Sequence, residues 1–168
     1  MAQAYTDRPT LAEWNARENW VERLAVARPA SSSSSSIDID CSGIRFTRYS
    51  EMWMIAYLTP SGDKAVNVYV NDIKADEYYD ENGLRGSAAT LLGNMFSLHR
   101  LSYVLSSNRI VGSAENTHYN NGKLVRTVAA SRLPNSVNDC NLAKISFECA
   151  DNGTLSGSDC VYLYGVRK

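Results

Sequence analysis

The sequence predicts a mainly β protein: an antiparallel, jelly-roll-like β-sandwich of about eight strands, preceded by one N-terminal helix and a serine-rich tether. Three observations support this prediction. From Ile37 onward, apolar and polar residues alternate with a period of two, which is typical of strands with one buried face. Turn signals separate these runs at the intervals expected for a sandwich. Six consecutive serines at 31–36 divide this part of the chain from a segment with helical signals.

The composition is that of a folded globular chain. The 168 residues include 44% hydrophobic and 21% charged residues, and the net charge is −1. A net charge close to zero argues against nucleic acid as a partner, because phosphate binding requires clustered positive charge. No apolar run approaches the ~18 residues of a membrane span, and the first residues lack the features of a signal peptide. We therefore expect no membrane insertion, and assembly in a cytoplasm.

The N-terminal segment, residues 1–30, is predicted to contain a helix over about residues 11–27. Thr10 and Glu13 form a capping box, and Pro29 ends the helix. A helix of this length is marginal by itself in water, so we expect it to anchor the chain on another subunit. The alternative is that it packs on its own sandwich. The residues expected to form the anchor are Leu11, Trp14, Trp20, Val21 and Leu24.

Residues 31–36 are predicted to be a flexible linker, since a run of serines buries no apolar surface. The β-sandwich domain is predicted over residues 37–168. Its two closing strands, Leu142–Ala150 and Cys160–Val166, are expected to be antiparallel neighbours joined by a loop that contains an Asn-Gly turn. Elsewhere in the domain, the patterns place one tryptophan in the core and one histidine at the surface. These two residues are Trp53 and His99.

The cysteines and acidic residues do not form a recognisable metal site. The cysteines are expected to be reduced, buried thiols, although a disulfide would be the alternative in an oxidising compartment. They include no Cys-x₂-Cys pair, and the acidic residues between Asp72 and Glu81 lack the spacing of an EF-hand calcium loop. We therefore expect no metal and no cofactor. The four cysteines are Cys41, Cys140, Cys149 and Cys160.

The residue types favour binding over catalysis. The two histidines, His99 and His118, do not lie in a nucleophile-elbow pattern, so we expect no enzymatic activity. Aromatic rings in loops can contact sugars, and Tyr78, Tyr79 and Tyr119 are the candidate ligand-binding residues. The alternative is that these rings belong to the core or to a subunit interface, where tyrosine is also enriched.

The closing segment carries a resemblance to a known class of proteins. Residues 156–166 read Ser-Gly-Ser-Asp-Cys-Val-Tyr-Leu-Tyr-Gly-Val, and they follow an Ile145-x-Phe147 strand and an Asn-Gly turn. This segment resembles the C-terminal ending of small virion proteins of tailed bacteriophages, and the opening strands at 36–44 and 52–58 fit the same module. The resemblance covers roughly residues 36–168. It implies a β-sandwich in a virion.

The resemblance implies a structural protein of the virion: a tail or head appendage subunit, anchored by its N-terminal segment, with a projecting sandwich that attaches to the host surface. The implied partners are other virion proteins, copies of the chain in a homotrimer or higher oligomer, and a host-cell-surface glycan. Two alternatives stay open, a purely structural assembly or decoration subunit and a free carbohydrate-binding module. Aromatic residues gathered on loops would favour attachment, whereas a large apolar surface on the sandwich would favour assembly.

Overall fold

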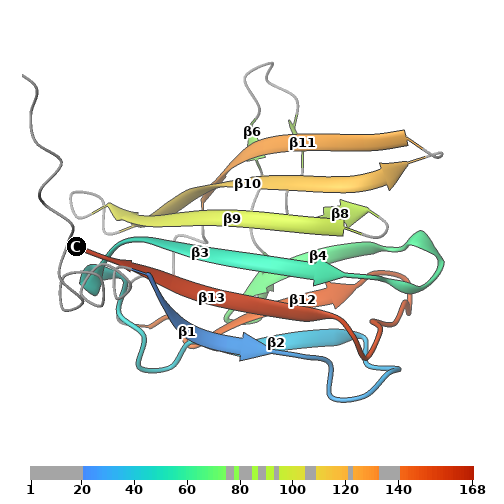
Figure 1. Cartoon of the computed structure of the whole chain (residues 1–168), viewed down its shortest axis with the longest axis horizontal. Coiled ribbons are helices and arrows are strands. Elements are labelled where there is room, and N and C mark those ends of the chain that lie inside the picture. The colour runs from blue at the N-terminus through green and yellow to red at the C-terminus, as the bar shows by residue number, and fades with distance from the viewer. Residues whose placement is uncertain are drawn as a thin grey trace, which may run out of the picture.

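The computed structural model describes residues 21–74, 78–79, 85–86, 90–92, 95–104, 109–120, 123–132 and 141–168 (Figure 1). Within these ranges the chain forms strands and two short 3₁₀ helices, and it forms no α-helix. The 3₁₀ helices are Phe46–Arg48 and Ser61–Asp63. The strands are β1 (Val21–Ala27), β2 (Ser36–Asp40), β3 (Tyr49–Leu58), β4 (Ala65–Val70), β5 (Ile73–Lys74), β6 (Tyr78–Tyr79), β7 (Arg85–Gly86), β8 (Thr90–Leu92), β9 (Met95–Val104), β10 (Arg109–Asn120), β11 (Lys123–Arg132), β12 (Lys144–Cys149) and β13 (Cys160–Arg167).

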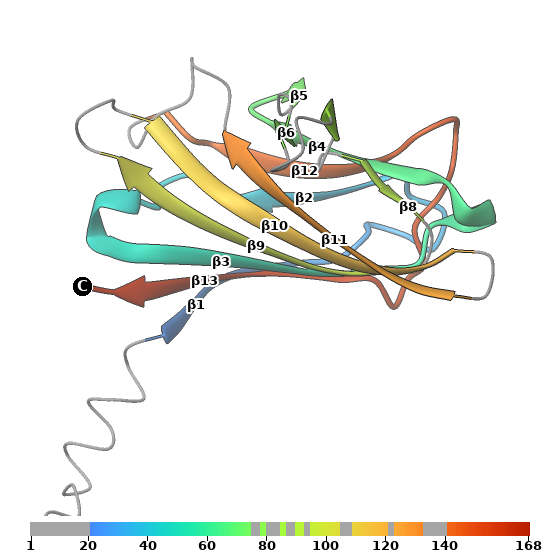
Figure 2. The ribbon, with the colours of Figure 1, turned by 90° about the horizontal axis from the view of Figure 1, so that it is seen from above.

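Two antiparallel sheets pack against each other as a sandwich, and Figure 2 shows them as two layers. The larger sheet has the strand order β1-β13-β3-β9-β10-β11. The smaller sheet has the order β2-β12-β4-β5, and β8 also pairs with β4. Strands β6 and β7 form a separate pair. The predicted mainly β sandwich is therefore confirmed, with more strands than the eight that the sequence suggests.

The core lies between the two sheets and follows from the alternation of side chains along each strand. The closing strand contributes Val161 and Leu163, which alternation along the strand places on one face and which are fully buried. Each buried side chain of this size contributes about 1.5–3 kcal/mol of stability relative to an exposed one. The buried residues of β3, β4 and β12 that pack against them are Met52, Met54, Ala56, Leu58, Val66, Val68, Val70, Ile145 and Phe147.

The helix predicted over residues 11–27 is not formed by the last seven of these residues, which are strand β1. Strand β1 pairs with β13, with Val21 opposite Val166, and an irregular register near Arg23 lets Leu24 pack against the core. The side chains here favour a helix, but pairing along a sheet edge and burial against the core override that local preference. The other expected anchor residues lie outside the described residues: Leu11, Trp14 and Trp20.

The serine run is part of the folded sandwich rather than the flexible linker that its composition predicts. The carbonyl of Ser34 accepts a hydrogen bond from the backbone N–H of Leu155 at 2.8 Å, and that of Ser35 accepts one from Cys149 at 2.8 Å. Ser36 is already the first residue of β2. Serines favour tight local turns, because their hydroxyls bond to nearby backbone groups. Since β1 also belongs to the sandwich, the described domain begins at Val21 and not at residue 37.

The two closing strands are not neighbours, so the predicted hairpin is wrong. Strand β12 lies between β2 and β4 in the smaller sheet, whereas β13 lies between β1 and β3 in the larger sheet. The loop between them crosses from one layer to the other, and the buried carboxylate of Asp159 braces it by accepting from the backbone N–H of Ser156 at 2.9 Å. Alternation along a strand indicates which face is buried, but it does not indicate which strand lies beside it.

The cysteines that the structure describes are free thiols. Cys41 and Cys160 are buried, Cys149 is half-buried, and Cys140 lies outside the described residues. Cys149 and Cys160 belong to different sheets, in β12 and β13. The prediction of reduced, buried thiols therefore agrees with the structure for Cys41 and Cys160.

Candidate functional site

The outer face of the larger sheet carries the most distinctive surface in the described part of the chain. In β3, the inward residues Met52 and Met54 alternate with Trp53, Ile55 and Tyr57, which project away from the core. The prediction that Trp53 is a core residue is therefore wrong. It is half-buried on the outer face, and its indole N–H donates to the carboxylate of Glu51 at 2.7 Å.

Four aromatic side chains from three adjacent strands meet on this face. The ring of Tyr57 lies 5.2 Å from that of Phe96 in β9 and 6.5 Å from that of Tyr162 in β13, measured between centroids. The rings of Tyr162 and Tyr164 stack at 6.2 Å with an angle of 25° between their planes. The strand pairings β13–β3 and β3–β9 bring these residues together. We call the cluster of Tyr57, Phe96, Tyr162 and Tyr164 the aromatic patch.

The aromatic patch is open to solvent. Tyr57 is 49% exposed and Phe96 is 36% exposed, and Val26 of the neighbouring strand β1 is 48% exposed. Figure 2 shows no other described strand over this face of the larger sheet. Contiguous exposed apolar surface is uncommon on isolated soluble domains and marks sites that contact another molecule.

The orientation of the rings suits contact with protein side chains. Tyr162 and Tyr164 stack on each other, so one face of each ring is already occupied. Tyr57 and Tyr162 meet edge to face, at 84°. Aromatic rings that pack in stacked and edge-to-face pairs form one continuous surface. The aromatic patch therefore resembles the aromatic-rich centre of a protein interface.

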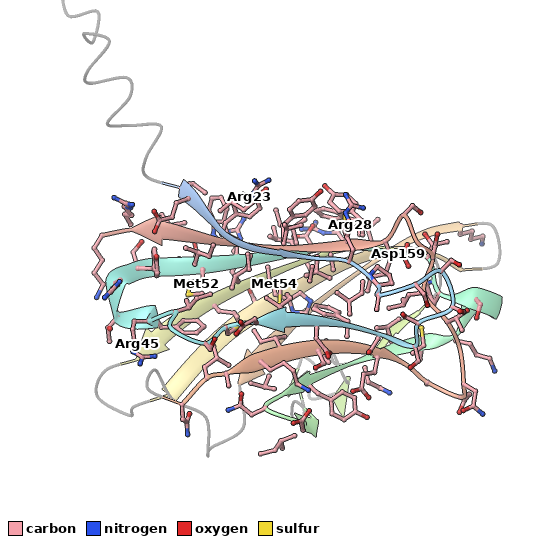
Figure 3. All side chains as sticks on the ribbon, turned by 90° about the horizontal axis from the view of Figure 1, so that it is seen from below. Arg23, Arg28, Arg45, Met52, Met54 and Asp159 are labelled. Carbon is pink, nitrogen blue, oxygen red and sulfur yellow. The ribbon has the colours of Figure 1, made fainter. Side chains whose placement is uncertain are left out.

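Positive charge borders the aromatic patch. Arg23 and Arg28 project from the outer side of the larger sheet, away from the buried Met52 and Met54 (Figure 3). Arg100 is exposed in β9, where it lies opposite Trp53 in the register. A partner that complements this face would present apolar side chains with acidic ones around them.

Tyr162 stays neutral near physiological pH. A hydrogen bond with the side chain of Cys160 is the main cause that raises the pKa of Tyr162 above its usual value. The positive charge of Arg28 opposes this shift. The neutral phenol of Tyr162 adds a hydrogen-bonding group to the patch without adding charge.

A shallow pocket of about 360 Å³ lies at one end of the sandwich, lined by Glu22, Arg48, Tyr49, Arg167 and Lys168. The hydroxyl of Tyr49 donates to the carboxylate of Glu22 at 2.6 Å, and the guanidinium of Arg167 donates to the same carboxylate. The hydrogen bond from Arg167 is the largest cause that lowers the pKa of Glu22, followed by that from Tyr49. These contacts hold the ends of β1, β3 and β13 together, so we interpret the pocket as structural.

Two titratable groups, His99 and Cys41, are buried in the core. His99 is only 2% exposed and lies on the inner face of β9, where its ring meets Phe147 edge to face at 6.0 Å. The prediction of a surface histidine is therefore wrong. Desolvation lowers the pKa of His99 to about 4, and desolvation is also the largest cause that raises the pKa of Cys41 to about 12. Both side chains are neutral and shielded from solvent near neutral pH.

The candidate ligand-binding tyrosines lie in strands. Tyr78 and Tyr79 form β6, which lies beside β11, and Tyr119 belongs to β10, opposite Leu124. The loop placement predicted for these three residues is thus wrong at the level of the backbone. Their side chains lie outside what the structure describes, and glycan binding by them stays a prediction. No single run of sequence indicates the aromatic patch, because its residues come from three strands.

Among the described residues, no group of three or more His, Cys, Asp or Glu side chains could hold a metal ion. In the same residues, no helix has the length and apolar character needed to cross a membrane. Comparison of the chain with models of known protein families, with curated proteins and with solved structures finds no match.

Proposed function

We propose that this chain is a structural subunit of a tailed-bacteriophage virion, part of a tail or head appendage, whose sandwich contacts neighbouring virion proteins through the aromatic patch. The observation that supports an assembly role is the position of the patch. It lies on the outer face of a sheet, and its rings are packed against one another. A subunit that repeats in a symmetric particle uses such surfaces to bind its neighbours.

The finer fold that we propose is a jelly roll, and the strand order supports it. Strands β1, β13, β3 and β9 are consecutive in the larger sheet, and β2, β12, β4 and β8 are consecutive in the smaller one. Successive strands from β1 to β4 alternate between the layers, and the two closing strands insert between earlier ones. This interleaving of eight strands in two sheets is typical of jelly rolls, which include viral capsid and lectin domains. The hairpin of β10 and β11 extends the larger sheet beyond β9.

The proposal also includes an anchoring role for the N-terminal segment and an oligomer, a homotrimer or larger. The support is the presence of Leu11, Trp14 and Trp20 in this segment, together with the sequence resemblance of the closing strand to phage virion proteins. Attachment to a host-surface glycan is the second candidate function. It rests on the three tyrosines Tyr78, Tyr79 and Tyr119.

The test is the presence of the chain in purified particles. Virions produced from the genome that encodes the chain would be purified on a density gradient and labelled with a specific antibody for electron microscopy. We expect regularly spaced label on the head or tail. Absence of the chain from particles that are otherwise complete and infectious would rule out the proposed function.

A separate measurement addresses glycan attachment. The purified full chain would be applied to an array of bacterial surface glycans, beside a variant with Tyr78, Tyr79 and Tyr119 changed to alanine. Binding that the triple variant loses would support attachment. Equal signals for both proteins would leave assembly as the role of the sandwich.

A further inference from the structure

The aromatic patch requires a cover that the described part of the chain does not supply. Tyr57 and Val26 are 49% and 48% exposed, whereas the inward side chains of β3 and β13 are buried. Aromatic side chains of this kind, once buried against a partner, are the residues that dominate binding at protein interfaces. The patch spans the three adjacent strands β13, β3 and β9, which is about 10 Å across at the usual strand spacing.

The first twenty residues of the chain have the size and chemistry of such a cover. They end at Val21, which begins the edge strand β1 of the larger sheet and is itself 38% exposed. They contain Leu11, Trp14 and Trp20, and the capping box at Thr10 predicts a helix that starts there. An α-helix with its side chains is about 10–12 Å in diameter, which matches the width of the patch.

Charge is compatible with the same pairing. Residues 1–20 contain the acidic residues Asp7, Glu13 and Glu18 and the basic residues Arg8 and Arg17, and the patch is bordered by the exposed arginines Arg23, Arg28 and Arg100. Glu13 and Glu18 at the edge of an apolar contact would complement these arginines, which improves the rate and the specificity of association.

The proposed role as a repeating subunit favours a neighbouring copy over the same chain. The segment joins the domain at Val21, in the edge strand β1 of the larger sheet. To cover its own patch, the chain would have to reverse its direction immediately before Val21. Asn15 and Asn19 are of a residue type that permits such a reversal, so the cross-linking experiment below distinguishes the two arrangements.

From these observations we infer that residues 1–20 of one copy dock on the aromatic patch of a neighbouring copy, with Leu11 and Trp14 against Tyr57 and Tyr162. This inference rests on the proposed role as a repeating subunit, and it identifies what the N-terminal anchor binds. The contact joins two different surfaces, so repeating it gives a ring where the rotation between copies closes and an open filament where it does not. A homotrimer held by three such contacts leaves no patch uncovered.

The first test measures self-association of the purified full chain by sedimentation equilibrium. Trp14→Asp in the segment and Tyr57→Asp in the patch should each weaken association by about ten-fold or more, because each removes a central aromatic contact. The double variant should lose little beyond either single one, since both changes affect one interface. Unchanged association in both single variants would overturn the inference.

Two controls separate this effect from general disruption. Ile73→Asp changes a residue of the smaller sheet that is 44% exposed, and Gln3→Asp adds the same charge near the start of the segment. Both should leave association within about two-fold of the unchanged chain. Circular dichroism would verify that Tyr57→Asp folds, and Tyr57→Ser provides a milder variant if it does not. Equal weakening by the controls would count against the docking site.

The second test asks whether the contact is made between copies. Trp14→Cys and Tyr57→Cys would be placed in two full-length chains carrying tags of different size, mixed and oxidised with diamide. A covalent product joining the two tagged chains, above the background of each variant alone, is the expected result. If one chain carrying both cysteines instead forms the cross-link within itself and no joined product appears, the segment covers its own patch and the inference is wrong.

These measurements are independent of the virion. They use the purified chain. If they fail and the chain is nevertheless found in particles, the docking inference is wrong and the proposed function stands. If the purified chain forms an oligomer through the aromatic patch but is absent from particles, only the proposed function is wrong.

Discussion

The aromatic ring of Tyr49 packs directly against the α-carbon of Gly165 in the neighbouring strand β13. A β-carbon at residue 165 would lie 2.4 Å from both Cδ1 and Cε1 of that ring, closer than real atoms approach. The ring in turn places the Tyr49 hydroxyl on the carboxylate of Glu22 in β1, at 2.6 Å. The absence of a side chain at residue 165 therefore allows three strands to be joined at one end of the sandwich.

We expect Gly165→Ala to destabilise the protein by about 1–3 kcal/mol, because overpacking forces the Tyr49 ring or the backbone to move. Urea denaturation would measure the change. Gly157→Ala is the matched control, since a β-carbon there would lie 3.7 Å from Cβ of Ser32, an ordinary contact. Adding Tyr49→Ala to Gly165→Ala should remove much of the penalty from the clash. Full additivity of the two changes would show that they do not interact.

A second prediction concerns Asn71, which fastens the turn after β4 to the segment that leads into β12. Its side-chain oxygen accepts from the backbone N–H groups of Ala143 and Lys144 at 2.9 and 3.0 Å, and its amide donates to the carbonyl of Asn141 at 2.7 Å. Its φ angle is +49°, a conformation that asparagine tolerates better than most residues. Asn71→Ala should therefore cost about 1–3 kcal/mol in unfolding free energy.

Two further substitutions divide the role of Asn71 into its parts. Asn71→Asp keeps the acceptor and loses the donor to Asn141, so it should cost less than Asn71→Ala. Asn71→Gly restores the freedom for positive φ but removes all three side-chain hydrogen bonds. If thermal denaturation ranks Asn71→Gly above Asn71→Asp in stability, backbone conformation matters more here than the hydrogen bonds.

A third prediction concerns acid and the buried imidazole of His99. Its pKa is about 4 in the folded protein and about 6.5 when the chain is unfolded, because burial disfavours the charged ring. Between these values the unfolded chain binds more protons, so stability rises with pH in this window. Through this residue, acidification from pH 7 to 4 should therefore lower the free energy of unfolding by about 3 kcal/mol.

The control for this prediction is His99→Leu, which has similar volume and does not titrate. Carboxylates with lowered pKa values, such as Glu22, Asp40 and Glu115, also make the protein less stable in acid. They are common to both proteins and cancel in the comparison. Denaturation at several pH values should show that His99→Leu gains about 3 kcal/mol of stability relative to the unchanged chain between pH 7 and pH 4. A constant difference would mean that His99 titrates normally in the fold.

A fourth prediction concerns Ser146, a buried residue in the middle of β12. Its hydroxyl is fully buried and has no hydrogen-bond partner among the described residues. Removing an unsatisfied buried polar group relieves its desolvation cost, so Ser146→Ala should raise the unfolding free energy by about 1 kcal/mol. Ser50→Ala serves as the comparison, since the hydroxyl of Ser50 donates to the carbonyl of Val166 at 3.1 Å. Destabilisation by Ser146→Ala would indicate a partner for the hydroxyl.

The local features of the fold could be predicted from the sequence. The valines at 66, 68 and 70 alternate with other residues, a pattern that predicts a strand over the observed range of β4, Ala65–Val70. The sequence Asn-Asn-Gly at 120–122 predicts a hairpin, and the structure pairs Asn120 with Lys123. Alternation also places Val161 and Leu163 on one face of β13, and the structure shows that both are buried. In each case the deciding information lies within a few consecutive residues.

The features that could not be predicted depend on neighbours distant in the sequence. The segment from Val21 to Ala27 has helix-favouring side chains, and only its pairing with β13 makes it a strand. The aromatic patch has the same origin, since Tyr57, Phe96 and Tyr162 are brought together by strand order. His99 lies between Leu98 and Arg100, and nothing in that triplet indicates which of them faces the core. A period of two defines two faces, and the rest of the fold decides which is buried.

The central position of β13 in the larger sheet has a consequence for the synthesis of the protein. As the chain leaves the ribosome, β1 and β3 emerge long before the strand that lies between them. Until β13 has left the ribosome, β1 and β3 each present an unpaired edge where β13 will lie. The insertion of β13 between them joins strands that are distant in the sequence, which is intrinsically slow. We expect nascent chains to depend on chaperones, and premature termination within β13 to yield aggregates rather than a smaller folded domain.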